Sequence, residues 1–187
     1  MSFIEDGKGS GRKASVSSVQ RLNVSSKTQP RIFYASRDFG SAYNAAVEGG
    51  STAAGDYSLY LKNDSTTANL FISVIEFHSV ENTKWKIWQV SGTAAGGTTV
   101  TPAELNLSKS IPAAVTCMGN SGGSITGLST VQQIGTHRNT ALGDSEMDWQ
   151  GALILGPGDA IAVEMDTGTT GLVSHDCFFW FEDIGAS

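Results

Sequence analysis

Short apolar runs separated by small polar residues make up most of this chain. In Tyr57–Lys62, apolar and polar side chains alternate, which places Leu59 and Leu61 on one face of an extended strand. Leu70–His78 is apolar over most of its length, as expected for a central strand of a packed sheet. Gly, Asn, Asp, Pro and Ser fill the gaps, and these residues favour turns. The pattern therefore predicts an all-β protein.

The predicted strands are similar in length and spacing. They are Ile32–Phe39, Tyr57–Lys62, Leu70–His78, Trp85–Val90, Ala114–Met118, Ser129–Ile134, Ala152–Leu155, Ala160–Met165 and Cys177–Phe181. Gly92–Gly97 and Gly119–Gly127 are expected to be glycine-rich loops, and no segment shows a sustained helical period. About eight or nine strands at this spacing predict a jelly-roll-like, two-sheet β-sandwich.

Composition favours one globular domain with an added segment. The chain has 187 residues, of which 40% are hydrophobic and only 16% are charged. No apolar stretch is long enough to span a bilayer, and the start, with Glu5 and Asp6, does not resemble a secretory signal. Cys117 and Cys177 do not make a disulfide framework. We expect two buried thiols, and a single bridge between them stays open.

Charge divides the chain into an N-terminal arm, residues 1–31, and a body, residues 32–187. The arm holds six basic and two acidic residues, a balance of +4, whereas the body has a balance of −10. A basic arm on an acidic body is suited to docking on a negatively charged neighbour. Nucleic acid is disfavoured because the arm lacks interleaved aromatic residues. We expect an acidic protein surface, such as that of another copy; the alternative is a solvated tail.

One motif resembles a catalytic site. Gly119-Asn-Ser-Gly-Gly123 is similar to the nucleophile motif of chymotrypsin-like proteases, in which a histidine base precedes the serine in the chain. Only His78 precedes Ser121, and its surroundings in the sequence do not match that family. We therefore expect a glycine-rich loop here and no catalytic residue.

Cofactor and metal sites are also not expected. Gly7-Lys8-Gly9-Ser10 lacks the spacing of a phosphate-binding loop. The three histidines are far apart in the sequence, and His175, Asp176 and Cys177 must alternate between the faces of a strand. Asp144, Glu146 and Asp148, near Trp149, are compatible with a sugar or calcium site, but we expect a solvated acidic loop.

The first residues carry a family resemblance. Ser2–Val16, followed by Arg21-Leu22, resembles the N-terminus of small virion proteins of tailed bacteriophages. In that family a Phe-Ile/Val-Glu-Asp-Gly-x-Gly-x-Gly start precedes Ala-x-Val, Arg-Leu and a β-sandwich. The match covers residues 2–22 and is general, at the level of the fold, beyond them. Members are mostly structural proteins of the particle, and capsid decoration or cement proteins share this layout.

The resemblance implies a non-enzymatic bacteriophage virion structural protein, in the first place a capsid decoration or cement protein. Such a protein binds and stabilises the capsid lattice through its arm. The implied partners are the major capsid protein or other virion proteins and further copies in a homotrimer. The implied location is the capsid surface, which the protein reaches after synthesis in the host cytoplasm. The resemblance implies no cofactor and no association with a membrane. The alternative is a receptor- or glycan-binding module of the tail, fibre or neck, which exposed Trp88 and Trp149 would favour.

The arm supplies the expected partner-binding residues. Apolar side chains at its start can anchor in a pocket, glycines allow close backbone approach, and basic residues meet acidic groups. These residues are Phe3, Ile4, Gly7, Gly9, Gly11, Arg12, Lys13 and Arg21.

Overall fold

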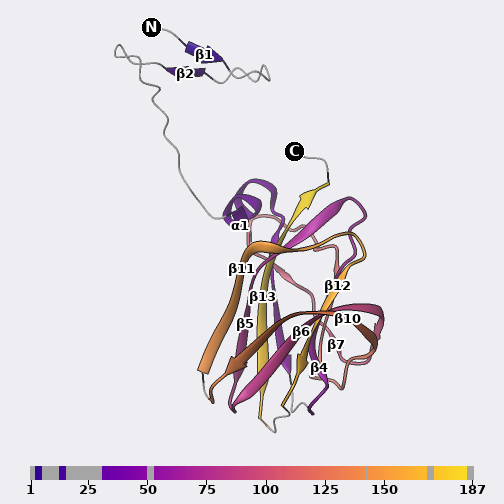
Figure 1. Cartoon of the computed structure of the whole chain (residues 1–187). Helices are drawn as coiled ribbons and strands as arrows, with labels where there is room; N and C mark the ends of the chain where they lie inside the picture. Colours follow the sequence, from indigo (N-terminus) through magenta and orange to yellow (C-terminus); the bar gives the residue numbers. More distant parts are fainter. Residues whose placement is uncertain are drawn as a thin grey trace.

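Two antiparallel sheets packed face to face form the body of the protein, as the computed structural model shows (Figure 1). The structure describes residues 3–5, 13–15, 31–49, 53–141, 143–167 and 171–184. The predicted all-β sandwich is confirmed, and the helical residues of the described segments are confined to positions 31–39. None of the described helices has the length and apolar character needed to cross a membrane.

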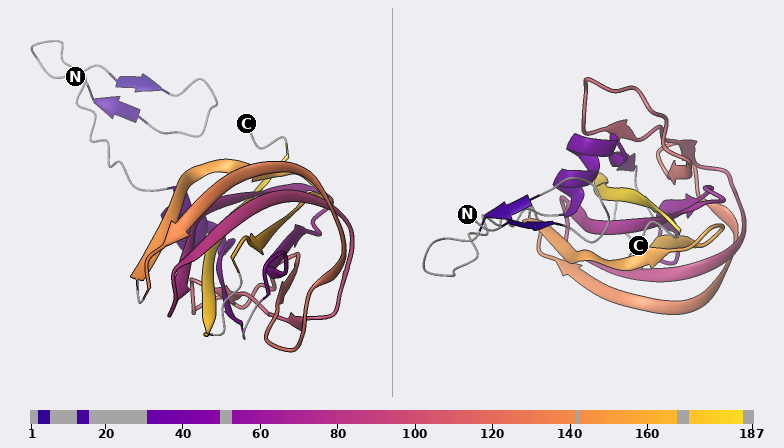
Figure 2. Two further views of the ribbon diagram at one scale, coloured as in Figure 1. Left: turned by 60° about the horizontal axis from the view of Figure 1, so that its bottom comes forward. Right: turned by 90° about the horizontal axis from the view of Figure 1, so that it is seen from above.

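Each sheet is a continuous antiparallel layer. The order in the five-stranded sheet is β11 (Gly143–Leu155), β5 (Ala68–Ser79), β13 (Val173–Asp183), β3 (Ala42–Gly49) and β8 (Ala103–Glu104). The order in the six-stranded sheet is β10 (Thr126–Asn139), β6 (Thr83–Ala95), β12 (Ala160–Met165), β4 (Tyr57–Asn63), β9 (Val115–Gly119) and β7 (Thr98–Thr99). Figure 2 shows both curved layers from two further sides.

The long strands follow the order of a jelly roll. Of the eight long described strands in chain order, the first, third, sixth and eighth form one sheet, and the others form the second. This arrangement is the double Greek key of the jelly-roll sandwich. The short strands β7 and β8, together with β9, lie between β6 and β10 in the chain and extend the two sheets at one edge.

The core lies between the sheets and takes every second residue of the long strands. Leu59 and Leu61 of β4 face Phe77 of β5 and Phe179 of β13 across this space, and all four side chains are buried. A smaller cluster around Tyr60 lies on the outer face of the six-stranded sheet. Both faces of β4 are therefore covered, which explains why Tyr60 is buried as well.

The predicted strand Ile32–Phe39 is wrong, because this segment is helical. It forms α1 (Arg31–Tyr34) and the π-helix η1 (Ala35–Phe39). The helical spacing brings the Arg37 guanidinium over the rings of Phe33 and Tyr34, at 5.4 and 5.1 Å. Gly40, with a φ of 64°, ends the segment in the left-handed conformation.

Two further predictions are wrong in part, and one strand was not predicted. The acidic loop around Asp144 and Asp148 is the first part of β11, which a bulge at Gln150 and Gly151 divides. Gly151 has a φ of 85° and lies against the Trp180 ring, so a side chain does not fit there. The loop predicted from Gly92 belongs to β6 as far as Ala95. Strand β3 was not predicted, because its small residues gave no clear apolar pattern.

The described parts of the arm are two short strands. β1 (Phe3–Glu5) pairs antiparallel with β2 (Lys13–Ser15), and Ile4 lies opposite Ala14. Of the arm residues expected to bind a partner, Gly7, Gly9, Gly11, Arg12 and Arg21 lie outside the described residues. Arg31, the last residue assigned to the arm, opens α1 and donates two hydrogen bonds to the Glu182 carboxylate, at 2.6 and 2.8 Å.

Polar and sulfur-containing groups are buried inside the sandwich. His175 packs edge-on against Phe77 and Trp85, and its Nε2 lies 2.8 Å from the Ser58 hydroxyl. Burial lowers the pKa of His175 to about 3. Cys117 and Cys177 are free and buried. Burial raises the pKa of both thiols, that of Cys117 to about 12, so they remain protonated and unreactive near neutral pH.

Core packing can be tested with one substitution at two positions. Leu59 is fully buried, whereas Leu107 is 91% exposed. We expect Leu59→Ala to lower the free energy of unfolding by about 2–5 kcal/mol, because it removes packed apolar atoms and leaves a cavity. Leu107→Ala should change it by less than about 0.5 kcal/mol. Chemical denaturation measures both, and equal effects would contradict the assigned core.

Acid sensitivity follows from His175. Below pH 6.5 the unfolded chain protonates this histidine, whereas the folded chain resists protonation until about pH 3. The contribution of His175 to stability is therefore complete above pH 6.5 and is lost as the pH falls, at up to about 1.4 kcal/mol per pH unit. Between pH 6.5 and about pH 3, the free energy of unfolding should decrease less steeply with falling pH for His175→Gln than for the wild type. Chemical denaturation at a series of pH values measures this dependence. Identical slopes would refute the assignment.

Candidate functional site

Six carboxylates gather on the outer face of the five-stranded sheet. Strands β3, β5, β11 and β13 each contribute outward-facing positions, because their alternate residues fill the core. We call this surface the carboxylate face; it consists of Glu48, Glu76, Asp144, Glu146, Asp148 and Asp176. These six make up a large share of the sixteen acidic residues of the body.

The register of the strands places like charges directly opposite one another. Glu146 of β11 pairs with Glu76 of β5, and Glu76 pairs with Asp176 of β13. Neighbouring strands are about 4.8 Å apart, so three carboxylates form a row across the sheet. Like charges in directly opposite positions destabilise a sheet. This row is therefore unfavourable for the isolated sandwich and favourable for binding a cationic partner.

His78 lies among these acids and is held in a fixed orientation. Its Nδ1 is 2.8 Å from Oδ1 of Asp144. Its Nε2 is directed at Glu76 and Asp176, at 3.8 and 3.7 Å from their carboxylate oxygens. Asn44 donates a hydrogen bond of 2.8 Å to the other oxygen of Asp176. Residues from four adjacent strands are thus connected through one imidazole.

The same residues have the composition of a possible metal site. The ligand atoms of Glu76, His78 and Asp176 all lie within 4.8 Å of one another. An imidazole with two carboxylates suits a transition-metal ion better than calcium, which prefers oxygen ligands alone. Sequence reasoning did not identify this group, because Asp176 meets His78 only through the pairing of β13 with β5.

The predicted alternation of His175, Asp176 and Cys177 between the two faces of a strand is confirmed.

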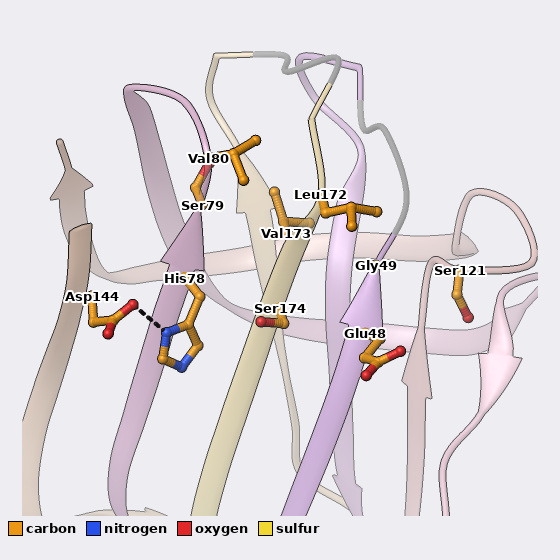
Figure 3. Close-up of a pocket in the computed structure, with 10 residues that line it drawn as sticks. All are labelled: Glu48, Gly49, His78, Ser79, Val80, Ser121, Asp144, Leu172, Val173 and Ser174. Atoms are coloured by element: carbon orange, nitrogen blue, oxygen red, sulfur yellow. Dashed lines mark hydrogen bonds and ion pairs between the residues drawn. The ribbon is translucent and has the colours of Figure 1, made fainter. Parts of the chain in front are cut away.

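A pocket of about 620 Å³ opens beside His78 at one end of the carboxylate face (Figure 3). Apolar and acidic groups share its wall. Leu172 is 70% exposed there, and Val80 is also exposed. The lining residues are Glu48, Gly49, His78, Ser79, Val80, Ser121, Asp144, Leu172, Val173 and Ser174. The pocket can therefore accept an apolar group next to a positively charged one.

Ser121 lines this pocket but is not arranged as a nucleophile with His78. Figure 3 shows Ser174 and Glu48, on intervening strands, between the two side chains. The Nε2 atom that a catalytic base would direct at a serine points at Glu76 and Asp176 instead. The pocket thus brings together a serine, a histidine and an aspartate without the hydrogen bond that a triad requires between the first two.

A second exposed surface lies at the end of the sandwich where the arm joins it. The loop after β8 packs on η1: Asn106 donates to the Ser36 carbonyl and Lys109 to the Asp38 carbonyl, both at 3.0 Å. Apolar side chains project from these two segments into solvent. We call this surface the arm-end patch; it consists of Phe39, Leu105, Leu107 and Ile111. Exposed apolar side chains on neighbouring segments are typical of protein-binding surfaces.

The two tryptophans proposed for glycan stacking are not freely exposed. Trp149 is half-buried and packs against the main core. Trp88 is half-buried and packs against the cluster around Tyr60. A sugar ring needs an open aromatic face, and neither tryptophan offers its full ring to solvent.

Comparison of the chain with models of protein families, with curated proteins and with solved structures gives no match.

The row of like charges predicts that removing one of them stabilises the fold. Glu146 is exposed and lies opposite Glu76. Glu146→Gln keeps the size of the side chain and removes one charge of the row, so we expect the free energy of unfolding to rise by about 0.2–1 kcal/mol at low salt. Added salt should reduce this gain, because it screens exposed charges. Thermal unfolding with and without salt measures the effect; a decrease in stability would show that the row is not repulsive.

Proposed function

We propose that this protein is a non-enzymatic virion structural protein of a tailed bacteriophage that attaches to the particle through its N-terminal arm. The capsid surface is the proposed location, where the protein acts as a decoration or cement protein on the lattice. Its partners are then the major capsid protein or other virion proteins, and it is made in the host cytoplasm before it joins the particle. The resemblance of residues 2–22 to such proteins motivates this choice.

One structural observation supports attachment most directly: the arm joins the sandwich beside the arm-end patch. Arg31 is fixed to Glu182 at the end of β13, and α1 lies at the same end of the body in Figure 1. Phe39 is 70% exposed and Leu107 is 91% exposed on the adjoining segments. A neighbour bound at this end would contact the arm and the patch together, so the two contacts reinforce each other.

Self-association belongs to the same proposal. The arm-end patch exposes apolar area that water disfavours, and symmetric assembly is the usual way to cover such a surface. A trimer suits the local three-fold positions of a capsid lattice. Repetition on a lattice also multiplies contacts that are individually weak. A glycan-binding role on a tail, fibre or neck draws less support, because Trp88 and Trp149 are half-buried.

Deleting residues 1–30 tests the role of the arm. The deletion keeps Arg31 and its bonds to Glu182. We expect a melting temperature within a few degrees of that of the full chain, because the described residues of the core clusters all belong to the body. Binding to particles that lack the protein, measured by co-sedimentation, should fall sharply.

Two comparisons make this test decisive. Leu107→Ala keeps the core intact and removes part of the arm-end patch, so it should weaken attachment less than the deletion does. Raised salt should weaken attachment only in part, because apolar contacts and strand pairing are not screened as charges are. Full occupancy of particles by the shortened chain would overturn the proposed function.

A further inference from the structure

Among the described residues, no lysine or arginine pairs with the carboxylate face. All six basic residues of the body are described, and they lie elsewhere: Lys62 pairs with Asp64, and Lys84 and Lys86 pair with Asp166. Arg37 pairs with Asp38, Lys109 donates to the Asp38 carbonyl, and Arg138 belongs to β10 of the other sheet. Among the described residues, His78 is thus the one nitrogen base on the carboxylate face.

An uncovered row of carboxylates needs positive charge from outside the sandwich. Glu146, Glu76 and Asp176 occupy directly opposite positions on three neighbouring strands. Their repulsion decreases when a cationic group binds over them, so binding there gains both attraction and relief of repulsion. The other half of the same sheet face is already covered, because Ala35 of η1 packs on Ala42 and Trp180.

The chain itself holds a segment of matching chemistry. Residues 1–30 contain five basic and two acidic residues, and three glycines stand close together at Gly7, Gly9 and Gly11. An apolar pair, Phe3 and Ile4, precedes the basic residues. The carboxylate face shows the complementary order: its acids continue into the pocket where Val80 and Leu172 are exposed. Charge and apolar character therefore match between the arm and this face.

We propose that the arm of one copy binds the carboxylate face of a second copy. The inference rests on the proposed function, in which the arm reaches beyond its own sandwich. Arg31, the last residue of the arm, fixes the arm's C-terminal end at Glu182. This point lies about 20 Å along β13 from Asp176. A contact in which different surfaces of two copies meet repeats head to tail, and it closes into a ring where the rotation allows. Three copies, each holding the next, give the trimer.

Two variants of the full chain separate the two halves of this contact. The face variant carries Glu76→Gln, Glu146→Gln and Asp176→Asn. The arm variant carries Lys8→Gln, Arg12→Gln, Lys13→Gln and Arg21→Gln. Each variant alone should self-associate at least about ten-fold more weakly than the wild type at about 50 mM salt, as measured by sedimentation velocity. Circular dichroism and melting curves establish that both variants are folded.

A mixture of the two variants is the decisive sample. The face variant retains an intact arm, and the arm variant retains an intact carboxylate face. We therefore expect the mixture to form a complex containing one copy of each variant, which about 0.5 M salt weakens. If the arm binds its own sandwich instead, the wild type is itself monomeric in sedimentation velocity, and the proposal is overturned.

Controls distinguish charge on this face from charge in general and from a bound metal. Asp159→Asn removes a carboxylate from the turn between β11 and β12 and keeps the oxygen that accepts from Gly156, so it should assemble like the wild type. Assembly should also persist in EDTA. If EDTA abolishes assembly, Zn²⁺ restores it and the arm variant behaves like the wild type, the face holds a metal, and the proposal is wrong.

These measurements use the purified chain alone, so they are independent of attachment to particles. Assembly of the mixture without any binding to particles would refute the proposed function and leave the contact between copies intact. Particle binding that needs the arm, together with a mixture that stays monomeric, would refute this inference and leave the proposed function intact.

Discussion

The alternation of side chains along β13 couples the interior of the sandwich to its outer face. His175, Cys177 and Phe179 point into the core, where their burial fixes the register of the strand. The same register directs Asp176 outward, opposite Glu76. A slip by one residue would exchange the two sets and place a carboxylate in the core. The packing of apolar and aromatic groups therefore holds the carboxylates in a row, despite their repulsion.

The sequence predicted most of the fold because the long strands carry clear periods. Leu59 and Leu61 repeat every second residue, and Leu70–His78 is apolar enough for a central strand of a packed sheet. The prediction failed where local and tertiary effects compete. Ile32–Phe39 has the apolar content of a strand, but contacts of Arg37 with two aromatic rings and the packing of Ala35 on Trp180 stabilise a helical turn.

The carboxylate face was less accessible to sequence reasoning. Glu76 and His78, two residues apart, were visible as one side of a strand, and Asp144 and Asp148 were visible as an acidic segment. Their meeting depends on which strands are neighbours and on the register between them, and neither follows from a single chain's periodicity. The first half of edge strand β11 was also hidden, because its outward-facing residues are polar and a bulge at Gly151 separates it from the predicted strand Ala152–Leu155.

The opposite charges of the arm and the body, and the two different ends of the outer face of the five-stranded sheet, have one physical interpretation. Among the described residues, the helical segment covers the sheet at the end that holds Trp180, and the end that holds Asp176 is acidic. A surface that lowers the free energy of unfolding of the isolated sandwich is tolerated if binding in the assembled state offsets that loss. In the contact that we propose, the five basic residues of positions 1–30 supply the compensating charge. In that contact, attraction between copies replaces repulsion within one copy, so assembly is favoured over the isolated sandwich.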